Sequence, residues 1–170
     1  WAQLSSMYEP VNHNRKIIGF DTFDGFPSLA SQDRSDEKDE HKIDGSYAFR
    51  SYDDLVEGVR LYDLNRSIGH VPKIELVSGD AIETIPAYIK NNQHLMVSLL
   101  YLDFDLYEPT KKAIECFVPR MPKGAIIAFD ELNQKQWPGE TLALLDTLGI
   151  NSLEIKRFPF SPALSYAVIS

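Results

Sequence analysis

The sequence lacks the features that mark disulfide-bonded, membrane-spanning or nucleic-acid-binding proteins. It has a single cysteine, Cys116, so it cannot form an internal disulfide. No apolar run approaches the roughly 20 residues that a transmembrane helix needs. Basic residues are in the minority, with 17 Lys and Arg against 25 Asp and Glu, whereas binding a nucleic-acid backbone requires a basic surface. We therefore expect a cytoplasmic protein that binds neither membranes nor nucleic acids.

The chain has enough apolar material for one globular domain. With 170 residues, of which 44% are hydrophobic and 25% charged, it can bury a substantial core. No internal repeat or linker divides it, so we expect a single domain over residues 1–170. The net charge of −8 does not by itself name a ligand.

Two apolar runs, 99–102 and 124–129, end abruptly in acidic pairs. The pairs are Asp103 with Asp105, and Asp130 with Glu131. Dense apolar runs of this length predict strands buried on both faces, which in a parallel sheet means helices on both sides. Open α/β sheets bind their ligands at the carboxyl ends of the strands. The sequence therefore predicts that these four carboxylates, here called the acidic rim, meet at one sheet edge.

The remaining pattern predicts a doubly wound, Rossmann-like α/β fold. Further strands are expected at 16–20 and 73–77, and helices at 51–66, 80–91, 109–120 and from 138 onward. The runs 152–158 and 164–169 are joined by a segment too short for a helical crossover, so they predict an antiparallel hairpin after a mostly parallel sheet. Residues 28–47 form a long polar loop, typical of a lid or a disordered segment.

The acidic rim suggests a hard divalent cation. No Cys or His lies near these acids in the sequence, so carboxylates and water favour Mg²⁺. Asp103, Asp130 and Glu131 would bind it, and a hydroxyl bound to the ion would lose its proton more easily. Asp105 would then accept that proton. The alternative, in which these acids are helix caps and loop residues on a solvated edge, stays open.

Two more acids follow predicted strands. Asp21 ends the strand at 16–20, where a carboxylate can accept hydrogen bonds from the hydroxyls of a nucleoside ribose. Asp80 begins the helix at 80–91, so it is either an N-cap or a residue beside a bound nucleoside. For both residues a purely local role is an equal or better reading of the sequence alone.

Four motifs together resemble one enzyme family. FDTFDGFP, SGDAIET, YLDFDLYEPTKKAIE and AFDELNQKQWPGET occur in the order and spacing of the TylF/MycF-like macrocin (sugar) O-methyltransferases, over roughly 16–140. This resemblance implies a class I methyltransferase that uses S-adenosylmethionine and Mg²⁺ to methylate a hydroxyl of a sugar or a glycosylated natural product. It also makes a homodimer or a higher homo-oligomer plausible.

The resemblance implies roles for individual positions. Metal binding falls to Asp103, Asp130 and Glu131, and the general base is Asp105. Cofactor binding falls to Asp21, Thr22, Phe23, Asp80, Ala81 and Asp103, and the substrate side to Tyr107, Trp137 and Glu140. The family more often has two aspartates where this chain has Asp130 and Glu131, so either the metal shifts or only one of these acids binds it. The polar loop 28–47 corresponds to the family's lid.

One expected segment is missing from the sequence. The glycine-rich loop after the family's first strand, which holds the methionine end of the cofactor, does not occur, and residues 1–8 correspond to the helix after it. We therefore expect either that the natural protein begins earlier or that the cofactor site is incomplete. Two other functions remain open, a non-catalytic nucleotide-binding or scaffold domain and a metal-dependent hydrolase.

Overall fold

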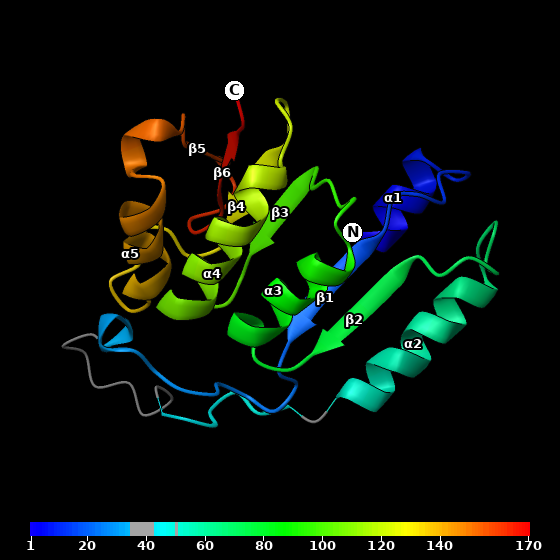
Figure 1. Ribbon diagram of the computed structural model, residues 1–170, viewed down its shortest axis with the longest axis horizontal. Coiled ribbons are helices and arrows are strands. Elements are labelled where there is room, and N and C mark those ends of the chain that lie inside the picture. The colour runs from blue at the N-terminus through cyan, green and yellow to red at the C-terminus, as the bar shows by residue number, and fades with distance from the viewer. Residues whose placement is uncertain (35–42, 50) are drawn as a thin grey trace.

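The computed structural model describes residues 1–34, 43–49 and 51–170 and has an α/β fold built on two sheets (Figure 1). The first sheet contains β1 (Ile17–Asp21) and β2 (Ile74–Ser78). The second has the order β3-β4-β6-β5, formed by β3 (Leu99–Leu102), β4 (Ile126–Phe129), β5 (Lys156–Arg157) and β6 (Ser165–Val168). The predicted strands are therefore confirmed with small differences at their ends, except that the run predicted at 152–158 is a strand only over Lys156–Arg157, and Ser152 lies in a 3₁₀ turn.

The strand directions confirm the predicted mixture of parallel and antiparallel pairing. β1 pairs with β2 and β3 with β4, both in parallel. β6 runs antiparallel to both β4 and β5, which makes the C-terminal hairpin. Figure 1 shows the arrowheads of β1, β2 and β3 pointing toward the same side of the molecule. The loops that leave this side carry most of the predicted site residues.

The structure has five α-helices among the described residues. They are α1 (Ala2–Tyr8), α2 (Tyr52–Leu64), α3 (Ala81–Asn91), α4 (Tyr107–Phe117) and α5 (Pro138–Thr147). Short 3₁₀ turns cover Ser31–Asp33 (η1), Val118–Arg120 (η2) and Ile150–Ser152 (η3). In Figure 1, α3 and α4 lie over one face of the strands, and α5 lies beside α4. In the described part of the chain, no helix is long and apolar enough to span a bilayer.

The main core lies between the second sheet and the helices α3, α4 and α5. Its fully buried side chains include Leu102 of β3, Ile114 of α4, Phe129 of β4 and Leu144 of α5. Cys116 packs against this core, and burial raises the pKa of its thiol. This side chain is therefore a core thiol and lies away from the acidic rim.

The helix α2 differs from its predicted packing. Its apolar residues have helical spacing, but none of its side chains is buried, and Leu55 and Val56 are 43% and 44% exposed. Of the apolar residues of α2, only Val59 and Tyr62 are partly covered. The spacing correctly predicted a helix, but the described residues do not cover its apolar stripe.

The two sheets are separate. Among the residues that the structure describes, β1 and β3 are not hydrogen-bonded to each other. Each therefore has an edge between the sheets that no described strand pairs. Side chains cross this boundary: the Phe20 ring lies 5.7 Å from Phe117, and the Trp1 ring lies 5.9 Å from Tyr101. The Arg15 Nη1 also donates to Ser98 Oγ at 2.7 Å.

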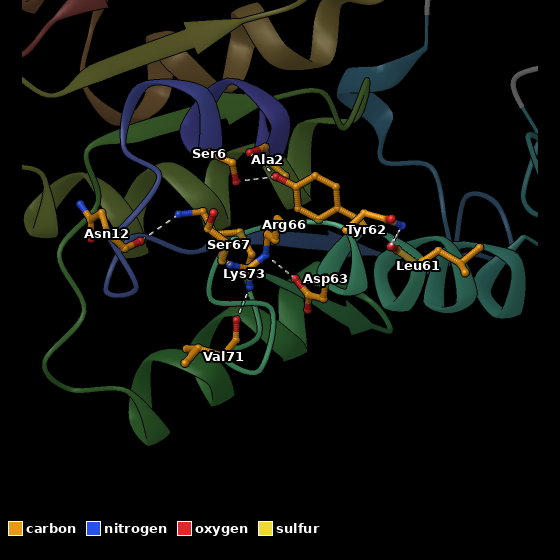
Figure 2. Close-up of polar contacts among 11 residues, drawn as sticks. Ala2, Ser6, Asn12, Leu61, Tyr62, Asp63, Arg66, Ser67, Val71 and Lys73 are labelled. Carbon is orange, nitrogen blue, oxygen red and sulfur yellow. Dashed lines mark hydrogen bonds and ion pairs between the residues drawn. The ribbon is translucent and has the colours of Figure 1, made fainter.

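Polar contacts join α1 to α2, and the loop after α1 to the residue before β2 (Figure 2). The Tyr62 hydroxyl donates to the Ala2 carbonyl at 2.7 Å and lies 2.6 Å from Ser6 Oγ. Lys73, only 3% exposed, donates to the Asn12 carbonyl at 3.1 Å. Burial lowers the pKa of the Lys73 ammonium group, so this contact joins β2 to the loop after α1 at some electrostatic cost.

Two adjacent leucines of α5 test the position of the core. Leu144 is fully buried, whereas Leu145 is 45% exposed. We expect Leu144→Ala to lower the free energy of unfolding by about 2–5 kcal/mol, because it leaves a cavity. Leu145→Ala, the matched control, should change it by no more than about 0.5 kcal/mol. Urea unfolding of both variants measures the difference, and equal losses would contradict this core.

Candidate active site

A pocket of about 180 Å³ lies at the carboxyl ends of β1, β2 and β3. The strand ends contribute Asp21, Thr22, Gly79, Asp80, Ala81, Asp103, Phe104, Asp105 and Leu106, and other segments add Gly25, Phe26, Pro27, Tyr47 and Pro109. Six residues predicted from the sequence thus meet around one space: Asp21, Thr22, Asp80, Ala81, Asp103 and Asp105. This is the sheet edge at which α/β folds bind ligands.

The turn after β1 is ordered by its own side chains. Asp21 Oδ1 accepts the Phe23 N–H at 2.6 Å, and the Thr22 hydroxyl donates to the Gly25 carbonyl at 2.6 Å. Phe23, predicted to bind the cofactor, has a positive φ of 58° and places its ring 4.9 Å from Tyr52 at the start of α2. It therefore does not line the pocket, while Asp21 and Thr22 do.

The second part of the polar loop packs against this turn. The Phe26 N–H donates to the Ser46 carbonyl at 2.9 Å, and the Gly45 N–H donates to the Phe26 carbonyl at 2.8 Å. Gly25 allows this approach: its φ is 84°, and a Cβ there would lie 2.4 Å from the Ser46 carbonyl oxygen. Residues 35–42 of the predicted lid lie outside the described residues, so the lid stays a prediction.

Three aromatic rings gather beside the pocket. Trp137, the residue before α5, lies 5.9 Å from the Phe26 ring and 6.1 Å from the Tyr47 ring. Phe26 and Tyr47 line the pocket themselves. Trp137 was predicted on the substrate side, and the structure puts it next to two pocket residues without making it part of the lining.

Asp80 is the helix N-cap that the sequence allowed, and its place beside a bound nucleoside stays a prediction. Its Oδ1 accepts the Ile82 N–H at 2.9 Å, so it is the N-cap of α3. It also lines the pocket, together with Ala81. The capping bond fixes one carboxylate oxygen and thereby sets the direction of the other.

The turn between β3 and α4 carries two members of the acidic rim. The protein around Asp103 removes water from part of its carboxyl, and the charges of Asp130 and Asp21 repel it, so the pKa of Asp103 is raised. Asp105 follows with a φ of 60°, a left-handed conformation that Asp adopts more readily than most residues. The backbone therefore reverses at Asp105, directly before α4.

The second acidic pair follows β4. The Tyr101 hydroxyl donates to Asp130 Oδ1 at 2.6 Å. Burial first, and then this bond and the nearby carboxylates, raise the pKa of Tyr101 well above its usual range, so the hydroxyl stays protonated and can donate. The charge of Asp130 also contributes to the raised pKa of Asp103. Asp103 and Asp105 line the pocket but Asp130 and Glu131 do not, so the meeting of all four carboxylates of the acidic rim stays a prediction.

Glu140 holds the backbone of this second acidic pair through a hydrogen bond. It is 0% exposed in the first turn of α5, and its Oε1 accepts the Glu131 N–H at 2.9 Å. Burial raises the pKa of Glu140 to about 8, and the charges of Asp130, Glu131 and Asp105 add to the shift. Glu140 was predicted on the substrate side. In this structure it is buried, outside the pocket lining, and hydrogen-bonds to the backbone of the acidic rim.

Tyr107 also differs from its predicted surroundings. Its side chain is 3% exposed, and its hydroxyl donates to Asp146 Oδ2 at 2.8 Å and accepts from Lys111 Nζ at 3.1 Å. These partners belong to α5 and α4. The Tyr107 hydroxyl therefore joins α4 to α5, and Tyr107 is not part of the pocket lining.

Asp33 is a residue near the site that the sequence did not reveal. It lies in η1, inside the polar loop, and is 2% exposed. Its Oδ1 accepts the Tyr107 N–H at 2.7 Å. Nothing in the local sequence distinguishes Asp33 from the other acids of the polar loop, because its partner lies 74 positions away.

The side chains of the acidic rim are of the chemical type that binds a hard cation. The described residues, however, gather no metal-binding group of three or more His, Cys, Asp or Glu side chains. Carboxylate oxygens are the donors that Mg²⁺ prefers, and the repulsion between Asp103 and Asp130 is the electrostatic condition that a cation would relieve. One Asp130 oxygen already accepts from Tyr101. The three-ligand set of Asp103, Asp130 and Glu131 therefore stays a prediction.

Comparison with known proteins identifies the family. The chain matches the family described as Macrocin-O-methyltransferase (TylF) over residues 5–142. It belongs to the TylF family. The calicheamicin methyltransferase CalS11 is 38% identical and superposes with a TM-score of 0.92, covering 98% of this chain and 65% of that one. A second CalS11 structure, an apo form described as TDP-rhamnose 3'-O-methyltransferase, is 36% identical, has a TM-score of 0.79, and covers 98% of this chain and 64% of that one.

Further comparisons support the fold of this TylF-family chain. The O-methyltransferase NovP superposes with a TM-score of 0.71 at 16% identity, covering 99% of this chain and 65% of that chain. The chain thus spans about 65% of the length of these solved relatives. No curated protein matches the chain. The resemblance inferred from the motifs is therefore confirmed at the level of the family.

The raised pKa of Glu140 predicts a pH dependence of stability. The folded protein binds this proton more tightly than the unfolded chain, so the stabilisation is complete below the ordinary pKa of 4.5 and is lost as the pH rises through about 8. We expect the free energy of unfolding to fall over this range, and to fall less in Glu140→Gln, which has no proton to lose. Urea unfolding in the presence of a chelator measures both curves.

The exposed Glu83 of α3 provides the matched control. Glu83→Gln should follow the pH dependence of the wild-type protein. Parallel curves for wild type and Glu140→Gln would show that Glu140 does not bind its proton more tightly in the folded state.

Proposed function

We propose that this chain forms the larger part of an S-adenosylmethionine-dependent O-methyltransferase that methylates a hydroxyl of a sugar. The observation that carries the proposal is the pocket at the strand ends, where Asp21 and Asp80 lie on one side and Asp103 and Asp105 on the other. Membership of the TylF family supplies the reaction class.

One side of the pocket suits the nucleoside of the cofactor. Asp21 already uses one oxygen for the Phe23 N–H, which holds its carboxylate in a fixed direction toward the pocket. A carboxylate at such a strand end can accept hydrogen bonds from the two ribose hydroxyls. Asp80 and Ala81 form the neighbouring wall at the start of α3, and Thr22 stays a further cofactor candidate.

The other side of the pocket suits the acceptor and its proton. Asp105 lines the pocket and would take the proton from the acceptor hydroxyl as the methyl group is transferred in line from the sulfonium. The rings of Phe26, Tyr47 and Trp137 give an apolar surface on which a sugar ring can pack. Because CalS11 is described as a TDP-rhamnose methyltransferase, a sugar nucleotide is the first acceptor to test.

A divalent cation belongs to the same proposal. Asp103 and Asp130 would hold it, with Glu131 as a third candidate, and their mutual repulsion supports this assignment. When bound, Mg²⁺ would make the acceptor hydroxyl more acidic. Tyr101 would meanwhile hold Asp130 in place through its hydroxyl.

The same proposal extends to the fold. Since β1 and β3 have unpaired edges that face each other between the sheets, we infer that a further strand pairs with both and completes a continuous doubly wound sheet. Such a strand would border the pocket between Asp21 and Asp103, where the methionine end of the cofactor would lie.

Methyl transfer by the full-length protein tests the proposed function. Incubated with S-adenosylmethionine, Mg²⁺ and a panel of sugar nucleotides and glycosylated natural products, it should add one methyl group to a sugar hydroxyl, detected by mass spectrometry. Asp105→Asn should lower kcat by about 100-fold or more, because general-base catalysis contributes at least this much. The exposed Glu108→Gln, in the same α4 turn, should behave as wild type.

Three outcomes would contradict the proposal or parts of it. Full activity in excess EDTA would remove the divalent cation from it. Wild-type rates in Asp105→Asn would remove Asp105 as the proton acceptor, and a protein that binds S-adenosylmethionine but methylates no member of the panel would favour the scaffold function.

Cofactor affinity tests the nucleoside side independently of turnover. Asp21→Asn should weaken S-adenosylmethionine binding by roughly 10- to 100-fold, because it removes the charge from the acceptor of two hydrogen bonds. Asp24→Asn, three residues further along the same turn and outside the pocket lining, is the control and should bind normally. Isothermal titration calorimetry measures both, and an unchanged affinity in Asp21→Asn would exclude the ribose contact.

A further inference from the structure

The buried carboxylate of Asp33 joins the polar loop to the turn that carries Asp105. Its Oδ1 accepts the Tyr107 N–H at 2.7 Å, and its Oδ2 accepts the Ala30 N–H at 2.8 Å. Asp33 is only 2% exposed. A carboxylate is removed from water at considerable cost unless hydrogen bonds replace the lost hydration, so these two bonds account for its burial.

The position of the acceptor on α4 makes this contact specific. Tyr107 is the first residue of α4, so its N–H has no partner within the helix. A negative charge at a helix N-terminus is also favoured by the partial positive charge there. The sequence predicted that α4 starts at Pro109, but the helix begins two residues earlier, at Tyr107. The Asp33 side chain explains the earlier start, because it accepts the first N–H of the helix.

Gly139, in the first turn of α5, lies close against the hydrogen bond between Asp33 and Tyr107. A Cβ built on Gly139 would lie 2.3 Å from Asp33 Oδ1 and 2.6 Å from the Tyr107 nitrogen. Only a glycine therefore allows the first turn of α5 to lie against the pair. The same helical turn carries Glu140, which holds the Glu131 N–H, so each acid-bearing turn is held by one buried carboxylate.

This arrangement affects the position of Asp105. It lies two positions before Tyr107 and has a left-handed backbone, with φ of 60°. The direction of the Asp105 side chain therefore depends on how the turn is held at both of its ends, by β3 and by α4. The strand β3 fixes one end through its pairing with β4, and Asp33 fixes the other end through the Tyr107 N–H.

We propose that Asp33 is a positioning residue for Asp105: by binding the first N–H of α4 it fixes the turn that directs the Asp105 carboxylate into the pocket. Gly139 is also required for this contact, because a residue without a side chain leaves room for the Asp33 carboxylate. The proposal rests on the proposed function for the role of Asp105 and requires no ligand contact from Asp33 itself.

Three variants of the full-length protein test the proposal. Asp33→Ala removes both acceptors, Asp33→Asn keeps the size and one acceptor oxygen, and Gly139→Ala pushes the carboxylate away from Tyr107. The matched control is Asp44→Ala, because Asp44 is an exposed acid of the same loop whose Oδ1 accepts the Leu29 N–H at 3.1 Å. It breaks a bond within the loop and leaves α4 untouched.

Two measurements separate positioning from general stability. Amide hydrogen exchange should be faster at 105–107 in Asp33→Ala and Gly139→Ala, less so in Asp33→Asn, and unchanged in Asp44→Ala. In methyl transfer, kcat should fall by about 10- to 100-fold in Asp33→Ala, because a misplacement of this kind has an effect of that order. Asp33→Asn should recover part of it, and the affinity for S-adenosylmethionine should stay within about twofold.

The outcomes distinguish this proposal from the proposed function. If the wild-type protein methylates nothing, the proposed function fails, while exchange at 105–107 still decides whether Asp33 holds the turn. Unchanged exchange there in Asp33→Asn and Gly139→Ala overturns the proposal, even if Asp33→Ala does not fold. A loss of kcat that is equal in Asp44→Ala and Asp33→Ala also overturns it, because the effect then belongs to the loop as a whole.

Discussion

Repulsion among carboxylates is the constraint on which this site depends. The charges of Asp130 and Asp21 act on Asp103, and those of Asp130, Glu131 and Asp105 act on Glu140. Such a group stays together only if donors or cations offset the repulsion. Here the donors are neutral: the Tyr101 hydroxyl binds Asp130, and backbone N–H groups bind Asp33 and Glu140. The fold thus holds these carboxylates in place through hydrogen bonds from a tyrosine hydroxyl and from backbone N–H groups.

The parts of the fold that depend on local pattern could be predicted from the sequence. Apolar runs located β3 and β4, because a strand buried on both faces has a nearly continuous apolar sequence. The N-cap of α3 was predicted at Asp80, since its partner Ile82 is only two residues away. The antiparallel hairpin of β5 and β6 followed from the length of its connection. The direction of parallel strands also explains why Asp21, Asp80, Asp103 and Asp105 line one pocket, although Asp130 and Glu131 are not part of its lining.

What could not be predicted depends on partners far apart in the sequence. Tyr107 was assigned to the substrate side, but its hydroxyl binds Asp146 of α5. Phe23 was assigned to the cofactor, but its ring packs on Tyr52. Asp33 resembles any solvated acid until α4 and α5 are placed around it. Spacing indicates which residues share a face of one element, whereas the packing of elements decides what that face meets.

The separation between the two sheets also has a thermodynamic consequence. As far as the structure describes it, the half that contains β1, β2 and α2 has no fully buried large side chain, and it meets the rest through contacts such as those of Phe20 and Trp1. Regions with so few buried apolar contacts open at a lower free energy than the core of the same molecule. In this chain by itself, this half can therefore melt as a separate cooperative unit while the main core stays intact, whereas the further strand inferred above would join the two halves by pairing with both β1 and β3. A ligand bound across both halves would couple their melting, and it would protect the weaker half more than the stronger one.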